Sequence, residues 1–142
     1  MKVTEWLQKH TAKYCQLLID EEIETILNKV IQHPQQIDYY VINHEQQVVG
    51  YIPLNKLANY VFAEHQPAQT RRQIFERIAS GNAEELMTRH FSFCYEDEEL
   101  DDITHRFIEN NLKLIPVLDQ DKKLISYIDI FPLIKESHNN LL

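Results

Sequence analysis

Hydrophobic and polar positions along the chain follow two periods, and the order of these periods suggests strands and helices in a fixed succession. Runs of β-branched and aromatic residues at 37–43 and 48–52 predict two strands of a hairpin. Apolar residues at helical spacing precede the hairpin at 20–33 and follow it at 54–64. A short apolar stretch at 15–19 predicts one more strand. The first half is therefore predicted to form a β-α-β-β-α unit.

The second half repeats this order of elements. The corresponding segments are strand, helix, strand, strand and helix at 91–95, 96–111, 113–119, 124–128 and 130–137. An offset of 76 residues places Tyr39 on Ile115 and Tyr51 on Tyr127 without a gap, and the preceding helices align at an offset of 77. Order, spacing and turn positions agree, so we predict an α+β fold built from a duplicated unit.

Two helices are predicted outside the repeats. One helix is predicted from Val3 to about Tyr14, because helical spacing places Trp6 near the same face as these two end residues. A further helix is expected at about 68–80. We divide the chain into an N-terminal helix with the first repeat, an inter-repeat linker helix, the second repeat and a polar tail, at 1–65, 66–86, 87–137 and 138–142.

The duplicated unit resembles the CBS domain family, whose members occur as tandem pairs called Bateman modules. The first repeat carries "YYVINHEQQVVGYIPLNKL", and the second carries Met87, an acid-rich helix start and "LIPVLDQDKKLISYI". The resemblance implies a sandwich-like α/β arrangement of two repeats about a pseudo-twofold axis. It also implies two clefts that hold AMP, ATP or S-adenosylmethionine in such pairs, a regulatory role, and further dimerisation.

The nucleotide motif that the resemblance implies is degenerate in both repeats. It consists of a small residue, two apolar residues, Ser or Thr, two variable residues, and Asp or Asn. Its small, hydroxyl and acid positions fall on candidate ligand-binding residues Gly50, Pro53 and Lys56 in the first repeat, and Ser126, Asp129 and Pro132 in the second. Neither repeat keeps the hydroxyl or the acid. A hydrogen bond to a charged group contributes about 1.5–3 kcal/mol. Losing the acid is therefore expected to lower the affinity of a site for a nucleotide roughly ten- to a hundredfold.

The replacements have both local and ligand-related interpretations. Pro53 and Pro132 suit the first turn of a helix, because a backbone N–H there has no hydrogen-bond partner within the helix and proline's lack of one costs nothing. Asp129 brings a negative charge toward a ligand's phosphate, which opposes binding. Lys56 is either a cation for an anionic ligand or an exposed lysine at a helix start. These alternatives stay open in the sequence.

Charge and composition exclude several other functions. The net charge is −8 and Lys and Arg form no basic stripe, so no nucleic-acid partner is expected. No apolar run is long enough to insert into a membrane, and the N-terminus lacks the apolar centre of a signal peptide, so we expect a cytoplasmic protein. The seven histidines and two cysteines show no zinc spacing, so no metal site is predicted. Cys94 and His105 could form a catalytic pair. We favour a protein without enzymatic activity, because Cys94 lies in an apolar strand and is expected in the core.

We therefore predict a non-catalytic regulatory or oligomerisation module, with a sensor of adenine nucleotides or S-adenosylmethionine as the alternative. No bound cofactor is expected for the first function. A homodimer is expected, with Trp6 and Tyr14 on an exposed helix face as candidate contacts. Residues 77–87, "RIASGNAEELM", resemble the linker that precedes the second repeat in chloride-channel-type proteins. A membrane transporter or an enzyme is therefore the expected partner.

Overall fold

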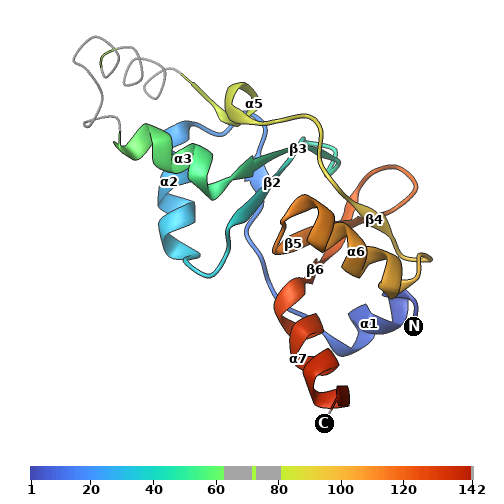
Figure 1. Ribbon diagram of the computed structural model, residues 1–142. Helices are drawn as coiled ribbons and strands as arrows, with labels where there is room; N and C mark the ends of the chain where they lie inside the picture. Colours follow the sequence, from blue (N-terminus) through green and yellow to red (C-terminus); the bar gives the residue numbers. More distant parts are fainter. Residues whose placement is uncertain (63–71, 73–80, 142) are drawn as a thin grey trace. The chain divides into compact units, whose positions relative to one another are not determined.

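The computed structural model describes residues 1–62, 72 and 81–141, which fall into two compact units. One unit is Cys15–Phe91, here called the first-repeat unit, and the other combines Met1–Tyr14 with Ser92–Leu142, here called the second-repeat unit. Each contains one three-stranded sheet and helices (Figure 1). The predicted α+β fold with a duplicated unit is confirmed. The pseudo-twofold arrangement of the repeats stays a prediction.

The first-repeat unit has the predicted order of elements. Its strands and helices are β1 (Leu17–Leu18), α2 (Ile23–Gln32), β2 (Asp38–Ile42), β3 (Val48–Pro53), α3 (Leu54–Val61) and α5 (Ala83–Leu86). Strand β2 is buried along its whole length, between parallel β1 and antiparallel β3. The central position explains its uninterrupted run of β-branched and aromatic residues, since no face of the strand meets water.

The second-repeat unit has the same topology. Its elements are α1 (Val3–Lys9), β4 (Cys94–Tyr95), α6 (Leu100–Asn110), β5 (Leu114–Leu118), β6 (Leu124–Asp129) and α7 (Ile130–Leu141). Ile115 pairs with Ile128 across β5 and β6, as Tyr39 pairs with Ile52 across β2 and β3. A register shift also occurs at the equivalent place in both hairpins. The predicted offset of 76 residues is therefore confirmed in the strand register.

Each repeat is preceded by a segment that packs in the other unit. We call residues 1–14 and 82–91 the lead-in segments. Val3 of α1 donates its backbone N–H to Glu98 O at 3.0 Å, and Ala83 of α5 donates to Glu21 O at 2.9 Å. Glu21 and Glu98 are equivalent positions of the two repeats. The lead-in segments thus make the same contact in opposite units.

The structure therefore divides the chain differently from the predicted ranges 1–65, 66–86, 87–137 and 138–142. Helix α1 belongs to the second-repeat unit because Val3 and Trp6 are part of its core. Within the predicted linker, the helix expected at 68–80 lies outside the described residues, apart from Arg72. Helix α5 follows it, and the Asn82 side chain accepts a hydrogen bond from Glu85 N at 3.2 Å.

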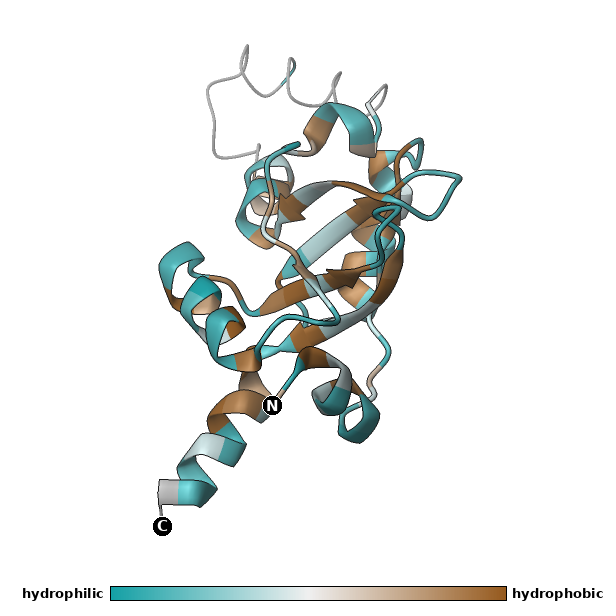
Figure 2. Ribbon diagram, turned by 90° about the vertical axis from the view of Figure 1, so that its right-hand side faces the viewer, coloured by the Kyte–Doolittle hydropathy of each residue, from teal (hydrophilic) through white to brown (hydrophobic). Residues whose placement is uncertain are grey.

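The predicted polar tail at 138–142 is helical as far as Leu141. Most hydrophobic residues of helix α7 lie near its beginning, and residues 135–140 are hydrophilic (Figure 2). Among the described residues, no helix combines the length and the apolar character that crossing a bilayer requires.

Candidate functional site

The candidate residues of the first repeat lie on β3 and α3. Gly50 is buried in β3, Pro53 ends that strand at the N-cap of α3, and Lys56 lies half-buried in the first turn of the helix. A Cβ atom added to Gly50 would lie 2.3 Å from Met87 Sδ and 2.8 Å from its Cγ. The space beside this glycine is therefore filled by Met87 of a lead-in segment.

The candidate residues of the second repeat lie on β6 and α7, and two of them face a cavity. Ser126 lies within β6, whereas Asp129 ends the strand and Pro132 lies in the first turn of α7. Asp129 and Pro132 line a cavity of about 240 Å³ together with Trp6, Lys9, His10, Thr11, Ala12, Tyr14 and Tyr127. The structure thus brings these two candidates together with α1 and the chain that follows it. Ser126 is not part of the cavity wall.

Three donors converge on the Asp129 carboxylate. Oδ2 accepts hydrogen bonds from the Tyr14 hydroxyl at 2.9 Å and from Lys113 Nζ at 3.1 Å. Oδ1 accepts one from the backbone N–H of Phe131 at 2.9 Å, at the start of α7. Only 12% of the Asp129 side chain is exposed. Burial, and then the hydrogen bond to Asp129, raises the pKa of the Tyr14 hydroxyl, so this hydroxyl keeps its proton and donates.

Aromatic rings form part of the remaining wall. The rings of Trp6 and His10 are stacked with centroids 3.8 Å apart, and His10 Nε2 lies 3.2 Å from the Glu136 carboxylate. Tyr14 meets Tyr127 edge to face at 5.4 Å. Ligand pockets usually measure about 300–1,000 Å³. The cavity therefore suits a small molecule, or one part of a larger ligand, held between aromatic rings and a paired carboxylate.

Several residues of this site were not found by sequence reasoning. Trp6 and Tyr14 were expected on an exposed dimer face, but Trp6 is buried and Tyr14 lies beyond the end of α1 at Lys9. Lys113 was not a candidate, because nothing local marks it as a partner of Asp129. The duplication offered one signal for Tyr14, since an offset of 77 places it on Phe91, another aromatic residue that precedes a repeat's first strand.

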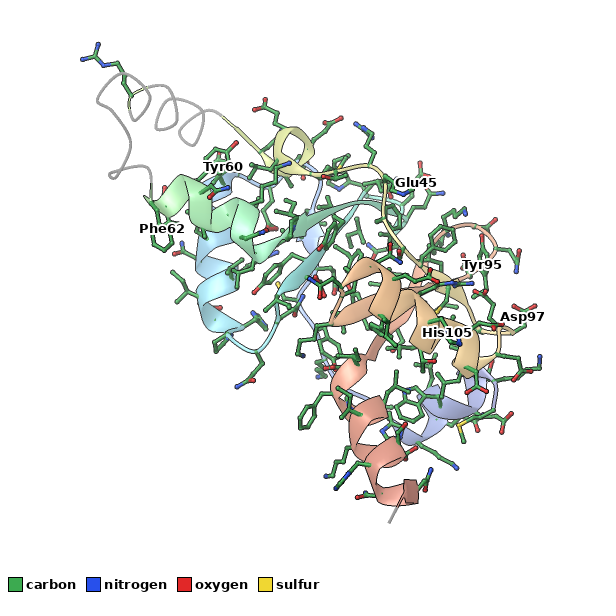
Figure 3. The ribbon with its side chains drawn as sticks, viewed as in Figure 1. Glu45, Tyr60, Phe62, Tyr95, Asp97 and His105 are labelled. Atoms are coloured by element: carbon green, nitrogen blue, oxygen red, sulfur yellow. The ribbon has the colours of Figure 1, made fainter. Side chains whose placement is uncertain are left out.

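The alternative catalytic pair is not brought together. Cys94 is fully buried in β4, and burial followed by the nearby Glu98 raises the pKa of its thiol to about 12. His105 lies exposed on α6 (Figure 3). A protonated, inaccessible thiol is a poor nucleophile.

The acid run at 96–102 has structural partners. Glu98 accepts hydrogen bonds from the Arg106 guanidinium, which lowers the pKa of its carboxyl, and from Tyr95 N. Glu99 pairs with Lys2 at 3.3 Å. Within the described ranges, no group of His, Cys, Asp and Glu side chains could hold a metal ion. Glu98 and Glu99 therefore help to stabilise the start of α6 through these ion pairs.

Comparison with known proteins gives a family match for one part of the chain and similar folds for the whole. The model of the CBS domain family matches residues 83–131. No curated protein matches the sequence. A CBS domain-containing protein from Thermotoga maritima has a similar structure, with a TM-score of 0.70 at 20% identity, over 94% of this chain and 92% of that chain.

Two further similar structures were determined with ligands. CBSX2 in complex with AMP has a TM-score of 0.75 at 16% identity, over 99% of this chain and 98% of that chain. The CBS domain pair of protein MJ0100, in complex with 5′-methylthioadenosine and S-adenosyl-L-methionine, has a TM-score of 0.70 at 16% identity over the same shares. Residues 83–131 are thus a CBS domain, and the chain as a whole has the fold of a tandem CBS-domain pair.

Proposed function

We propose that this CBS-domain pair is a non-catalytic, cytoplasmic module that dimerises and regulates a transporter, a channel or an enzyme. The observation that carries the proposal is an apolar groove of about 470 Å³ between α6 and α7. Its apolar lining residues are Phe107, Ile108, Ile130, Leu133 and Ile134. Contiguous exposed apolar surface of this kind usually marks a site of protein association.

The duplication supports a second copy of the chain as the occupant. Ile108 on α6 is 76% exposed, and the equivalent residue of the first repeat, Ile31 on α2, is 74% exposed. Phe62, at the end of α3, is also exposed (Figure 3). An isologous dimer needs self-complementary surfaces, and two similar apolar helix faces on one chain provide them. A regulated protein would respond when a ligand or partner favours one orientation of the repeats over another.

Replacing Ile108 by Asp is expected to convert the dimer into a monomer, because the new charge would be buried against an apolar partner surface. Light scattering coupled to size exclusion measures the mass of each variant. Asn110→Asp is the matched control: it adds the same charge to α6 outside the groove and should leave the dimer intact. A monomeric wild-type chain, or a dimer that survives Ile108→Asp, would contradict the proposed surface.

A second candidate function is a sensor of adenine nucleotides or S-adenosylmethionine that uses a nonstandard site. The cavity beside Asp129 and Pro132 favours it, as do the ligands bound to CBSX2 and to the MJ0100 pair. Calorimetric titration of the wild-type chain with AMP, ADP, ATP and S-adenosylmethionine tests it. Saturable binding in the micromolar range would support a sensor. The absence of both heat and thermal stabilisation would leave the dimerising module as the function.

The narrower attribution to the cytosolic part of a chloride-channel-type transporter rests on the resemblance of residues 77–87 alone. It predicts that the regulated partner is a membrane protein. In cells, the dimer is then expected to copurify with such a membrane protein. The Ile108→Asp variant is expected to lose this association.

A further inference from the structure

The Asp129 carboxylate lies where three separate parts of the second-repeat unit each supply a donor. Tyr14 follows α1, Lys113 precedes β5, and the Phe131 N–H belongs to the first turn of α7. The hydroxyl and the ammonium bind Oδ2 and the backbone N–H binds Oδ1, and donors of these kinds are the ones that proteins use to hold an oxyanion. Asp129 itself supplies that oxyanion, and it also lines the cavity.

We propose that Asp129 is a built-in anion that fills an oxyanion site at the cavity wall, so that the cavity selects ligands presenting a hydrogen-bond donor, and not a phosphate or carboxylate, to this position. The inference deepens the sensor function proposed above and rests on it for the occupant of the cavity. The oxyanion site itself is a property of the chain, whether or not a ligand binds.

Competition explains the selectivity. A group tethered within the fold has an effective concentration in the millimolar range or above, so a free oxyanion cannot readily displace Asp129. The carboxylate has about four acceptor positions, of which the three donors use three. Within the described part of the chain this leaves one position on Oδ1, which can accept from a ligand's amine, amide or hydroxyl. Lys113 also pairs with Asp129, so this carboxylate is not an uncompensated negative charge in the wall.

The test is to vacate the site and supply an anion from solution. In Asp129→Ser the hydroxyl can still accept the Phe131 N–H, as serine does at helix starts, while space opens beside Tyr14 and Lys113. Sodium formate should then raise the melting temperature in a saturable way, relative to sodium chloride at the same ionic strength. For a chain of this size, an anion at about 100 times its Kd should raise the melting temperature by roughly 5–10 °C.

Two variants control this result. Glu136→Ser removes another carboxylate of the same unit, one that is 48% exposed and pairs with His10, and it should show no specific effect of formate. Asp129→Ser with Lys113→Met removes a donor of the site and should lose the stabilisation. If formate affects Asp129→Ser no more than Glu136→Ser, the proposed oxyanion site is wrong.

Poor folding of Asp129→Ser would not leave the question open. If this variant is unfolded in chloride, the proposal expects formate to restore its folding, and a variant unfolded in both salts overturns it. Titrations of the wild-type chain separate the two proposals. Binding of S-adenosylmethionine without a formate effect would retain the sensor and reject the oxyanion site, whereas a formate effect without ligand binding would do the reverse.

Discussion

Replacing Trp6 by alanine is expected to destabilise the second-repeat unit by about 3–5 kcal/mol, the range for removing a large aromatic ring from a core. Trp6 is only 2% exposed, belongs to the core of that unit and stacks on His10. Its loss leaves a void under α1, which a helix of seven residues cannot close by itself. Urea unfolding followed by far-ultraviolet circular dichroism measures the change. Circular dichroism is needed because Trp6 is the sole tryptophan of the chain.

Lys9→Ala is the control for this experiment, since Lys9 lies exposed on the same helix. Surface substitutions of this kind usually change stability by no more than about 0.5 kcal/mol. An effect of Trp6→Ala as small as that of Lys9→Ala would show that α1 does not contribute to the core. The wild-type fluorescence gives an independent readout, because a tryptophan buried in this core should emit at shorter wavelength than one in water.

Gly50→Ala is expected to destabilise the first-repeat unit by about 1–3 kcal/mol, the usual range for overpacking a core. The added Cβ would lie 2.3 Å from Met87 Sδ and 3.0 Å from Met87 Cβ, so the side chain must move near its root and not only at its flexible end. The backbone around Met87 is also restrained, because Thr88 N donates to Tyr51 O at 2.9 Å. The same urea titration measures the loss.

A double-mutant cycle identifies the cause of this loss. Met87→Ala removes the atoms that the new methyl group meets, so Gly50→Ala should be much less harmful in the Met87→Ala background. Ser126→Ala, at the equivalent position of the second repeat, should be nearly neutral. If Gly50→Ala costs the same with and without Met87, the glycine is needed for a reason other than its contact with this residue.

Much of the fold could be predicted because the duplication checks each element twice. A single apolar run such as that around Tyr39 is ambiguous, but the equivalent run around Ile115 appears with the same neighbours and the same turn length. The placement of α1 was missed for a physical reason. The apolar face that contains Val3 and Trp6 indicates that the helix packs against another surface, but it does not say whether that surface is a second copy, as we expected for Trp6, or the second repeat.

The candidate site was predicted only in part. The motif position drew attention to Asp129 and Pro132, which do line the cavity. The two side chains that donate hydrogen bonds to Asp129 could not be found from the sequence, because Tyr14 lies 115 residues away and Lys113 lies 16 residues away. Hydrogen bonds across such separations depend on the topology, and local spacing does not encode them. Pro132 lies in the first turn of α7, as its sequence suggested, and still forms part of the wall.

The exchanged lead-in segments change what a cut in the chain would do. A protease that cleaves once between residues 63 and 80 makes two pieces, each of which holds part of both units. The N-terminal piece keeps α1 in the second-repeat unit, and the C-terminal piece keeps α5 in the first-repeat unit. We expect the two pieces to stay associated after such a cut, because each piece contributes residues to the cores of both units. Each unit is thus assembled from two parts of the chain that lie far apart in sequence.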